Sequence, residues 1–255
     1  MKPAVYLDGV DAESFDWERH MARYSARLFT TPEGRRSVCQ MDPLAFAVVY
    51  LGHHLRAEAT GNRITFGDAH LDWFRRAQAW CTVPLTEPKQ ERDVEIAPRS
   101  MGKTTFWFLI APMWAAAFGW LKFVGAFSDS GENAQEHLKT FRHELDTNVL
   151  LKADFPELCT PMVKSTERRK LADNVGTIRQ ANGFTFKAKG INTPALGMKV
   201  GKLRPDLLLL DDIEKGEENY SPKAAQSRLS TVSGLTVITI GDLADLPKLL
   251  RRVHR

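Results

Sequence analysis

Hydrophobic and polar positions change their spacing near Asp93. Before that point apolar residues recur at helical intervals, most clearly in DPLAFAVVYLGHHLRAE, where Asp42 is a suitable N-cap and Pro43 takes the first helical position. The segment ITFGDAHLDWFRRAQAW predicts a second amphipathic helix. The first part of the chain is therefore expected to be helical.

Beyond Asp93 short apolar runs alternate with helical stretches. We expect strands at VEIA, KFVGAFS, TIRQ, FTFKAK, LLLL and TVITI, with TIRQ and FTFKAK forming a hairpin around Asn182 and Gly183. Helices are expected from about Gly102, through ENAQEHLKTFRHEL, and after Ser221 and Pro222. This alternation is typical of an α/β fold with a mostly parallel central sheet flanked by helices.

Composition agrees with a folded domain. Of 255 residues, 43% are hydrophobic and 26% are charged, which excludes a disordered tail and suits one large α/β domain. We expect a helical N-terminal segment at residues 1–60 and the α/β core at residues 61–255. Cys39, Cys81 and Cys159 show neither a disulfide framework nor zinc-ligand spacing, which favours a reducing cytosol.

The uncharged run from Thr104 to Leu121 approaches the roughly 20 apolar residues of a membrane span. Pro112 and Gly119 interrupt this run, and no second apolar run follows. We interpret it as a helix buried on all sides within the α/β core. The first twenty residues contain five acidic residues and no apolar centre, which argues against a secretory signal.

The net charge and the positions of the histidines give only weak indications of function. Lysine and arginine number 35 against 31 acidic residues, and the net charge of +4 indicates a mild preference for anionic partners. His53 and His54 suggest a metal site, but neighbouring residues on a helix point in different directions and no carboxylate follows with matching spacing. We interpret them as partly exposed structural histidines.

The sequence APRSMGKTT, residues 97–105, has the chemistry of a phosphate-binding loop. Gly102, Lys103 and Thr104 fit the end of the pattern G-x-x-x-x-G-K-[ST], with Ala97 in place of the first glycine. In this motif backbone N–H groups hold phosphate oxygens, the lysine neutralises the β and γ phosphates, and the hydroxyl ligates Mg²⁺. The expected nucleotide-binding residues are Pro98, Arg99, Ser100, Met101, Gly102, Lys103, Thr104 and Thr105.

Four leucines, Leu207 to Leu210, lead into the acidic sequence DDIE. A nearly continuous apolar run is typical of a strand buried on both faces, and carboxylates at its C-terminal end fall where parallel sheets bind ligands. We expect Asp211 to hold Mg²⁺ together with Thr104, and either Asp212 or Glu214 to orient and deprotonate the attacking water.

In the order and spacing of its sequence blocks, the chain resembles the ATPase half of the large terminase subunits of tailed phages. The blocks are DPLAFAVVYL, ITFGDAHLDWFR, IAPRSMGKTTFWFLIAPMWAAA, FVGAFSDSGENAQEHLKTFRHELDTNVLL, KGINTPALGMKVGKLRPDLLLLDDIE and ENYSP. The resemblance implies a P-loop NTPase that hydrolyses ATP with Mg²⁺ and drives double-stranded DNA into a procapsid. It implies that Arg99 contacts the γ-phosphate or senses its loss. Terminases often carry glutamate where Asp212 stands, so the base stays open between Asp212 and Glu214.

The resemblance also implies partners. They are double-stranded DNA held without sequence preference, the portal protein, the small terminase subunit and further copies of the chain, in the host cytoplasm. The resemblance of the glycine-containing loop before the carboxylate strand implies contacts to DNA phosphates, without sequence readout, from Lys187, Lys189, Lys199 and Lys202. The segment from Phe66 to Phe74 resembles the element that lies beside the adenine. Either His70 or an aromatic residue of this segment would contact the base, and His70 could equally be an interior helix residue.

The end of the chain departs from the family. Asp242 stands where a coupling motif would have a threonine, and the chain stops at Arg255, before any nuclease domain. We therefore expect a truncated ATPase core without nuclease activity. Two alternatives stay open, namely a helicase-like DNA-stimulated ATPase and a non-hydrolysing remnant that binds DNA or the portal as an assembly component.

Overall fold

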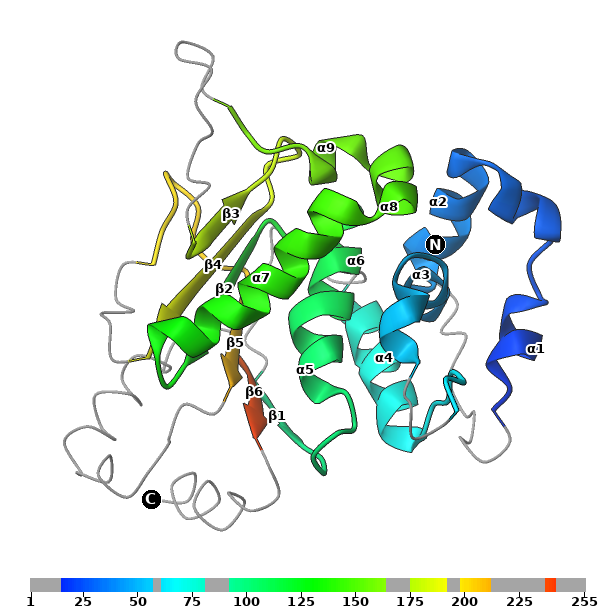
Figure 1. The fold of residues 1–255 in the computed structure, drawn as a ribbon, viewed down its shortest axis with the longest axis horizontal. Coiled ribbons are helices and arrows are strands. Elements are labelled where there is room, and N and C mark those ends of the chain that lie inside the picture. The colour runs from blue at the N-terminus through cyan, green and yellow to red at the C-terminus, as the bar shows by residue number, and fades with distance from the viewer. Residues whose placement is uncertain are drawn as a thin grey trace.

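The computed structural model describes residues 15–56, 61–80, 92–163, 175–191, 198–211 and 237–241. Within these ranges one sheet has the strand order β1-β6-β5-β2-β4-β3 (Figure 1). The strands are β1 (Arg92–Ile96), β2 (Phe123–Ser128), β3 (Thr177–Arg179), β4 (Thr185–Gly190), β5 (Leu207–Asp211) and β6 (Val237–Gly241). Neighbouring strands pair in parallel, except that β3 runs antiparallel to β4 at the sheet edge. The expected mostly parallel α/β sheet and its hairpin are confirmed.

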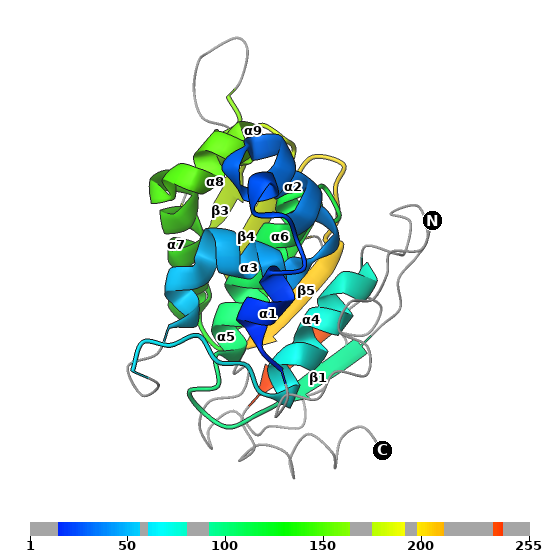
Figure 2. The same cartoon turned by 90° about the vertical axis from the view of Figure 1, so that its right-hand side faces the viewer.

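Helices lie beside the sheet in two layers (Figures 1 and 2). They are α1 (Trp17–Met21), η1 (Ala26–Thr30), α2 (Pro32–Met41), α3 (Pro43–Leu51), η2 (Gly52–Leu55), α4 (Asp68–Trp80), α5 (Lys103–Thr105), η4 (Phe106–Ile110), α6 (Ala111–Ala117), α7 (Gly131–Thr147), α8 (Val149–Asp154) and α9 (Pro156–Cys159). Helix α7 packs on β4 and β2, with α5, η4 and α6 beside it. The N-terminal helices, blue in Figure 1, lie outside this layer. The helical N-terminal segment is thus confirmed, whereas the expected helix after Ser221 lies outside the described residues.

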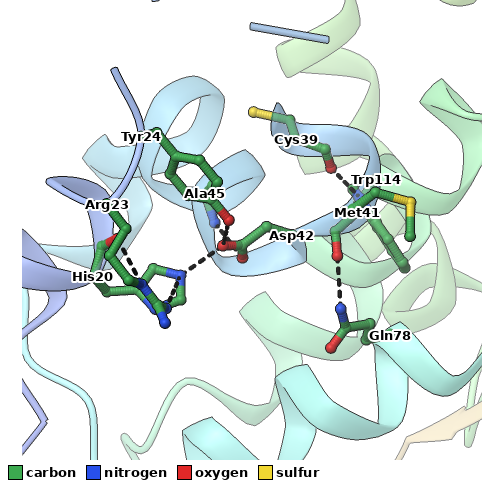
Figure 3. Close-up of polar contacts among 9 residues, drawn as sticks. All are labelled: His20, Arg23, Tyr24, Cys39, Met41, Asp42, Ala45, Gln78 and Trp114. Carbon is green, nitrogen blue, oxygen red and sulfur yellow. Dashed lines mark hydrogen bonds and ion pairs between the residues drawn. The ribbon is translucent and has the colours of Figure 1, made fainter. Parts of the chain in front are cut away.

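The buried side chain of Asp42 caps the start of α3 and bonds to α1. Its Oδ1 accepts a hydrogen bond from the Ala45 backbone N–H at 3.0 Å, and Pro43 follows at the first helical position, so α3 begins as the sequence predicts. Its Oδ2 accepts the Tyr24 hydroxyl at 2.8 Å and pairs with His20 Nε2 at 2.5 Å (Figure 3). Burial alone would raise the pKa of Asp42, but these hydrogen bonds outweigh it and hold that pKa below its usual value. One buried carboxylate therefore starts α3 and anchors α1.

Two side chains of the core bind the C-terminal end of α2. The last carbonyl groups of a helix have no partner within the helix. Trp114 Nε1 donates to the Cys39 carbonyl at 2.8 Å, and Gln78 Nε2 donates to the Met41 carbonyl at 2.7 Å (Figure 3). Because Trp114 lies on α6 and Gln78 on α4, the N-terminal segment is bonded to two helices of the core.

A buried ion pair joins α2 to α8. Asp154 accepts two hydrogen bonds from Arg35, from Nε at 2.6 Å and from Nη2 at 2.7 Å, and a third from the Tyr50 hydroxyl at 2.6 Å. The Asp154 side chain is 0% exposed and that of Arg35 is 11% exposed. Although burial favours the protonated acid, the Arg35 and Tyr50 hydrogen bonds lower the pKa of Asp154, so the carboxylate is ionised.

The apolar run that resembled a membrane span forms the continuous helical stretch α5, η4 and α6. Every residue from Phe106 to Ala116 is buried, which confirms the expectation of a helix surrounded by the core. The five residues of η4 form a π-helical turn that ends at Ile110, two positions before Pro112. A wider turn accommodates the proline ring, which in a regular α-helix collides with the carbonyl four residues earlier. Among the described residues, no helix has both the length and the apolar character needed to cross a membrane.

The sheet has apolar contacts on both faces. Leu207 and Leu209 of β5 belong to the core beneath the helices, whereas Leu208 and Leu210 pack on the opposite face with Phe123 and Met198 among others. The expectation that the four leucines form a strand buried on both faces is confirmed. Asp211 follows at the C-terminal end of this strand, where burial decreases.

Candidate functional site

The loop at residues 97–102 connects β1 directly to α5. Gly102 has φ +77° immediately before the helix, and Ser100 has φ +65°. Glycine adopts this left-handed conformation without steric cost, so Gly102 suits the sharp entry into α5. Lys103 is only 8% exposed, and its Nζ donates to the Ala97 carbonyl at 2.5 Å. The lysine side chain thus turns back across the loop and joins its two ends.

Most of the loop faces solvent. Lys103 is buried, Met101 is half-buried, and Pro98, Arg99, Ser100, Gly102 and Thr104 are exposed. The loop follows the C-terminal end of a parallel strand, which is where α/β sheets bind ligands. The residues expected to bind nucleotide are therefore mostly at the surface there, with Lys103 buried among them.

His70 of α4 supports this loop. Its Nε2 donates to the Met101 carbonyl at 2.8 Å, and its Nδ1 accepts from the Gly67 backbone N–H at 2.9 Å. These two bonds assign the imidazole hydrogen to Nε2. Contact with a base, one of the two roles that the sequence left open for His70, stays a prediction. The structure adds a third role, because the hydrogen bond from His70 holds the Met101 carbonyl of the loop in place.

Glu95 is a buried carboxylate that the sequence analysis missed. It lies on β1, is 5% exposed, and accepts a hydrogen bond from Trp73 Nε1 at 2.9 Å. Arg76 also pairs with Glu95 and in turn bonds to Asp72 at 2.6 Å. Helix α4 therefore fixes the strand that leads into the loop. The available signal was the single acidic residue inside the apolar run VEIA.

The sheet register places Asp211 of β5 opposite the end of β1, with β6 between the two strands. Both Glu95 and Asp211 pair with Ile240 of β6 in the sheet register. Adjacent strands are about 4.8 Å apart, so β1 and β5 lie about 10 Å apart. The carboxylate is thus near the start of the loop and on the same edge of the sheet.

A histidine from α7 contacts this carboxylate. His137 Nε2 lies 3.0 Å from Asp211 Oδ2, and the two side chains are 14% and 17% exposed. The imidazole also stacks on Phe108, with ring centroids 4.1 Å apart and planes 28° from parallel. The sequence analysis did not single out His137. Its spacing of three from Ala134 and four from Phe141 places it on the buried stripe of α7, which was the available signal.

The two candidate bases, Asp212 and Glu214, lie outside the described residues. The structure therefore brings together the loop with Lys103 and Thr104, the carboxylate of Asp211, and two supporting histidines, His70 and His137. The choice between Asp212 and Glu214 stays as the sequence left it.

The four lysines expected to contact DNA fall into two pairs. Lys187 and Lys189 are half-buried on β4, on the face opposite Phe186, whose ring contacts Phe141 of α7 at 5.1 Å. Burial, and then the neighbouring charge of Lys189, lowers the pKa of Lys187. The second pair, Lys199 and Lys202, is exposed in the segment before β5.

His53 and His54 correct one step of the sequence analysis. They are partly exposed, as expected, but the argument that neighbouring histidines must point apart is wrong here. They lie in the 3₁₀ turn η2, and both Nε2 atoms are 2.9 Å from Oε1 of Glu144. The carboxylate comes from α7, far away in sequence, so no local spacing rule finds it.

Comparison of the chain with models of known protein families and with curated proteins gave no match.

Proposed function

We propose that the chain is the Mg²⁺-dependent ATPase motor domain of a phage terminase large subunit. It couples ATP hydrolysis to translocation of double-stranded DNA into a procapsid. The observation that carries the nucleotide-binding part is the unit formed by β1, the loop at residues 97–102 and α5. Its left-handed Gly102 allows the sharp entry into α5, and Lys103 begins the helix at the position that the motif gives to the phosphate-binding lysine.

The residues present fit a triphosphate and a divalent cation. Exposed backbone at the start of the long helical stretch is available to phosphate oxygens, and the Lys103 ammonium lies at the same loop. Mg²⁺ bound there would neutralise charge between the β and γ phosphates. The Thr104 hydroxyl and Asp211 would hold it, with a water between Asp211 and the ion.

The sheet order supports this division of roles. The strand that ends at Asp211 lies two strands away from β1, and β1 leads into the loop and α5. Arg99 contacts the γ-phosphate or senses its loss, and Asp212 or Glu214 orients and deprotonates the attacking water.

The motor part of the proposal rests on the resemblance of the sequence blocks to terminases and on the placement of basic residues. Lys187 and Lys189 lie next to each other on one face of β4, and Lys199 and Lys202 are exposed before β5. Such groups bind phosphates without reading the sequence of the bases. DNA, the portal protein and the small terminase subunit are the proposed partners, with further copies of the chain on the portal.

Nucleotide binding is the first test. The purified chain is expected to bind ATP in the presence of Mg²⁺, and Lys103→Ala is expected to weaken binding by roughly 100-fold, since a charged hydrogen bond to phosphate is lost. Lys139→Ala is the matched control because Lys139 is 61% exposed and pairs only at the surface with Glu136. If Lys103→Ala is folded by circular dichroism and binds ATP like the wild type, the site is wrong.

Measurements of ATP turnover distinguish a packaging motor, a helicase-like ATPase and a non-hydrolysing assembly component. Phosphate release that rises with intact duplex DNA supports a packaging motor. Strand separation on a forked duplex would replace it with a helicase-like ATPase. Nucleotide binding without phosphate release, with DNA and the portal both present, would instead make the chain a non-hydrolysing assembly component.

A further inference from the structure

His53, His54 and Glu144 form a compact group on the side of α7 that faces the N-terminal helices. The two imidazole rings lie beside each other with centroids 4.3 Å apart. Both Nε2 atoms point at the same carboxylate oxygen, and the candidate ligand atoms of the three residues all lie within 4.8 Å of one another. Nothing in the proposed ATPase reaction uses these groups.

The dimensions of this group suit a metal ion. In a tetrahedral site with metal–nitrogen bonds of about 2.05 Å and a metal–oxygen bond of about 2.1 Å, the donor atoms are about 3.4 Å apart. The present nitrogen–oxygen distances are 2.9 Å. Each nitrogen–oxygen distance would lengthen by about half an ångström to admit the ion.

The carboxylate is held in position. Asn148 Nδ2 donates to Glu144 Oε2 at 2.9 Å and to the Tyr50 carbonyl at 2.7 Å, so the second carboxylate oxygen is fixed by a residue that is itself hydrogen-bonded to α3. Oriented outer partners of this kind are a regular feature of metal sites.

The group is also accessible. Glu144 is 4% exposed at its side chain, whereas His54 is 24% and His53 is 57% exposed. An ion can enter from solvent, bind the buried carboxylate and leave one position for water. Two imidazoles and one carboxylate favour Zn²⁺ and neighbouring transition metals, whereas Mg²⁺ prefers oxygen ligands.

We propose that His53, His54 and Glu144 bind one Zn²⁺ ion through two imidazole nitrogens and one carboxylate oxygen, with a water as the fourth ligand. The ion joins η2 of the N-terminal segment to α7, which packs directly on the sheet. It takes the place of the Nε2 hydrogens that otherwise bond to the carboxylate, so each neutral imidazole carries its one hydrogen on Nδ1 when the ion is bound. This site is separate from the loop at residues 97–102, and its test does not depend on whether the proposed ATPase function is correct.

The test is a titration of the metal-free full chain, without an affinity tag, with Zn²⁺ followed by calorimetry. We expect one ion per chain, no displacement by excess Mg²⁺, and a loss of affinity of at least about 10-fold in His53→Ala and in His54→Ala. His143→Ala is the matched control, because His143 is an exposed histidine on the same helix next to Glu144. It should bind Zn²⁺ like the wild type.

A second measurement reports geometry. Co²⁺ in place of Zn²⁺ is expected to give the visible absorption of a four-coordinate ion, and His54→Ala should remove it. The proposal is overturned if the wild type binds no Zn²⁺, if His53→Ala and His54→Ala both keep wild-type affinity, or if binding disappears in a Cys39→Ser variant instead. In the first case the group is a hydrogen-bonded cluster that only holds η2 against α7.

Discussion

Replacing Asp154 by asparagine removes the negative charge of the buried pair but keeps the shape of the side chain. In the native structure Asp154 accepts two hydrogen bonds from Arg35 and one from the Tyr50 hydroxyl. An amide has only one oxygen acceptor, and its NH₂ group would face the donor groups of the arginine. The variant therefore leaves a largely buried guanidinium without its counter-charge.

The expected cost follows from this burial. Breaking a buried pair by removing one partner costs about 3–5 kcal/mol, because the other charge stays desolvated. Asp154 at 0% and Arg35 at 11% exposure belong to this class. In a chain of this size, 1 kcal/mol changes the midpoint of thermal unfolding by about 2–4 °C, so Asp154→Asn should lower that midpoint by roughly 6–20 °C.

Urea unfolding followed by circular dichroism measures the free energy directly. The control is Glu136→Gln, which removes a surface pair whose partners are 61% and 63% exposed and should cost below about 1 kcal/mol. In the Asp154→Asn background, Arg35→Met should recover part of the loss, since no unpaired charge remains. A cost within about 1 kcal/mol of the control, or no recovery in the double variant, refutes the reasoning.

Three further outcomes are expected. First, if the proposed ATPase is correct, His137→Ala removes the side chain that contacts the Asp211 carboxylate. The Mg²⁺ concentration for half-maximal ATP hydrolysis should then rise by roughly 10-fold, with the KM for ATP at saturating Mg²⁺ unchanged. If the variant and the wild type show the same Mg²⁺ dependence, His137 is not a positioning residue. Second, Gly190→Ala should destabilise the chain by about 1–3 kcal/mol in urea, because the new Cβ would lie 2.8 Å from the Gly131 backbone nitrogen, whereas Gly52→Ala has nothing within 4 Å and should be neutral. Third, the pKa of Glu144 is lowered to about 2 from 4.5, so its contribution to the free energy of unfolding is complete above about pH 4.5 and is lost as the pH falls towards 2. Wild type should therefore lose more stability than Glu144→Gln over that interval, and parallel pH curves would contradict the assignment.

Local signals predicted the elements of the fold well. Asp42 and Pro43 mark the start of α3 because capping is a matter of a few neighbouring residues. The leucines of β5 marked a strand buried on both faces because an unbroken apolar run has few other solutions. Gly102 ends the loop after β1 and Lys103 begins α5, so the helix starts where the sequence predicted it.

The contacts that complete the candidate sites were not predictable in the same way. His137 meets Asp211, and Glu144 meets two histidines, only after distant parts of the chain have packed together. Helical spacing says which residues share a face, but not which carboxylate of another element will face them. Glu95 was missed for the same reason, since its partners lie on α4.

The position of β6 has a consequence for how the protein is made. β1 and β5 are not paired with each other, and each is paired with β6. At about 5–20 residues per second, a ribosome needs roughly 7–29 s to proceed from Ile96 to Gly241. During that time β1 has no partner among the described strands, although the N-terminal helices are already synthesised and β2, β3, β4 and β5 are synthesised before β6. If the proposed nucleotide site is correct, nucleotide added to arrested nascent chains should bind only to those that extend past β6.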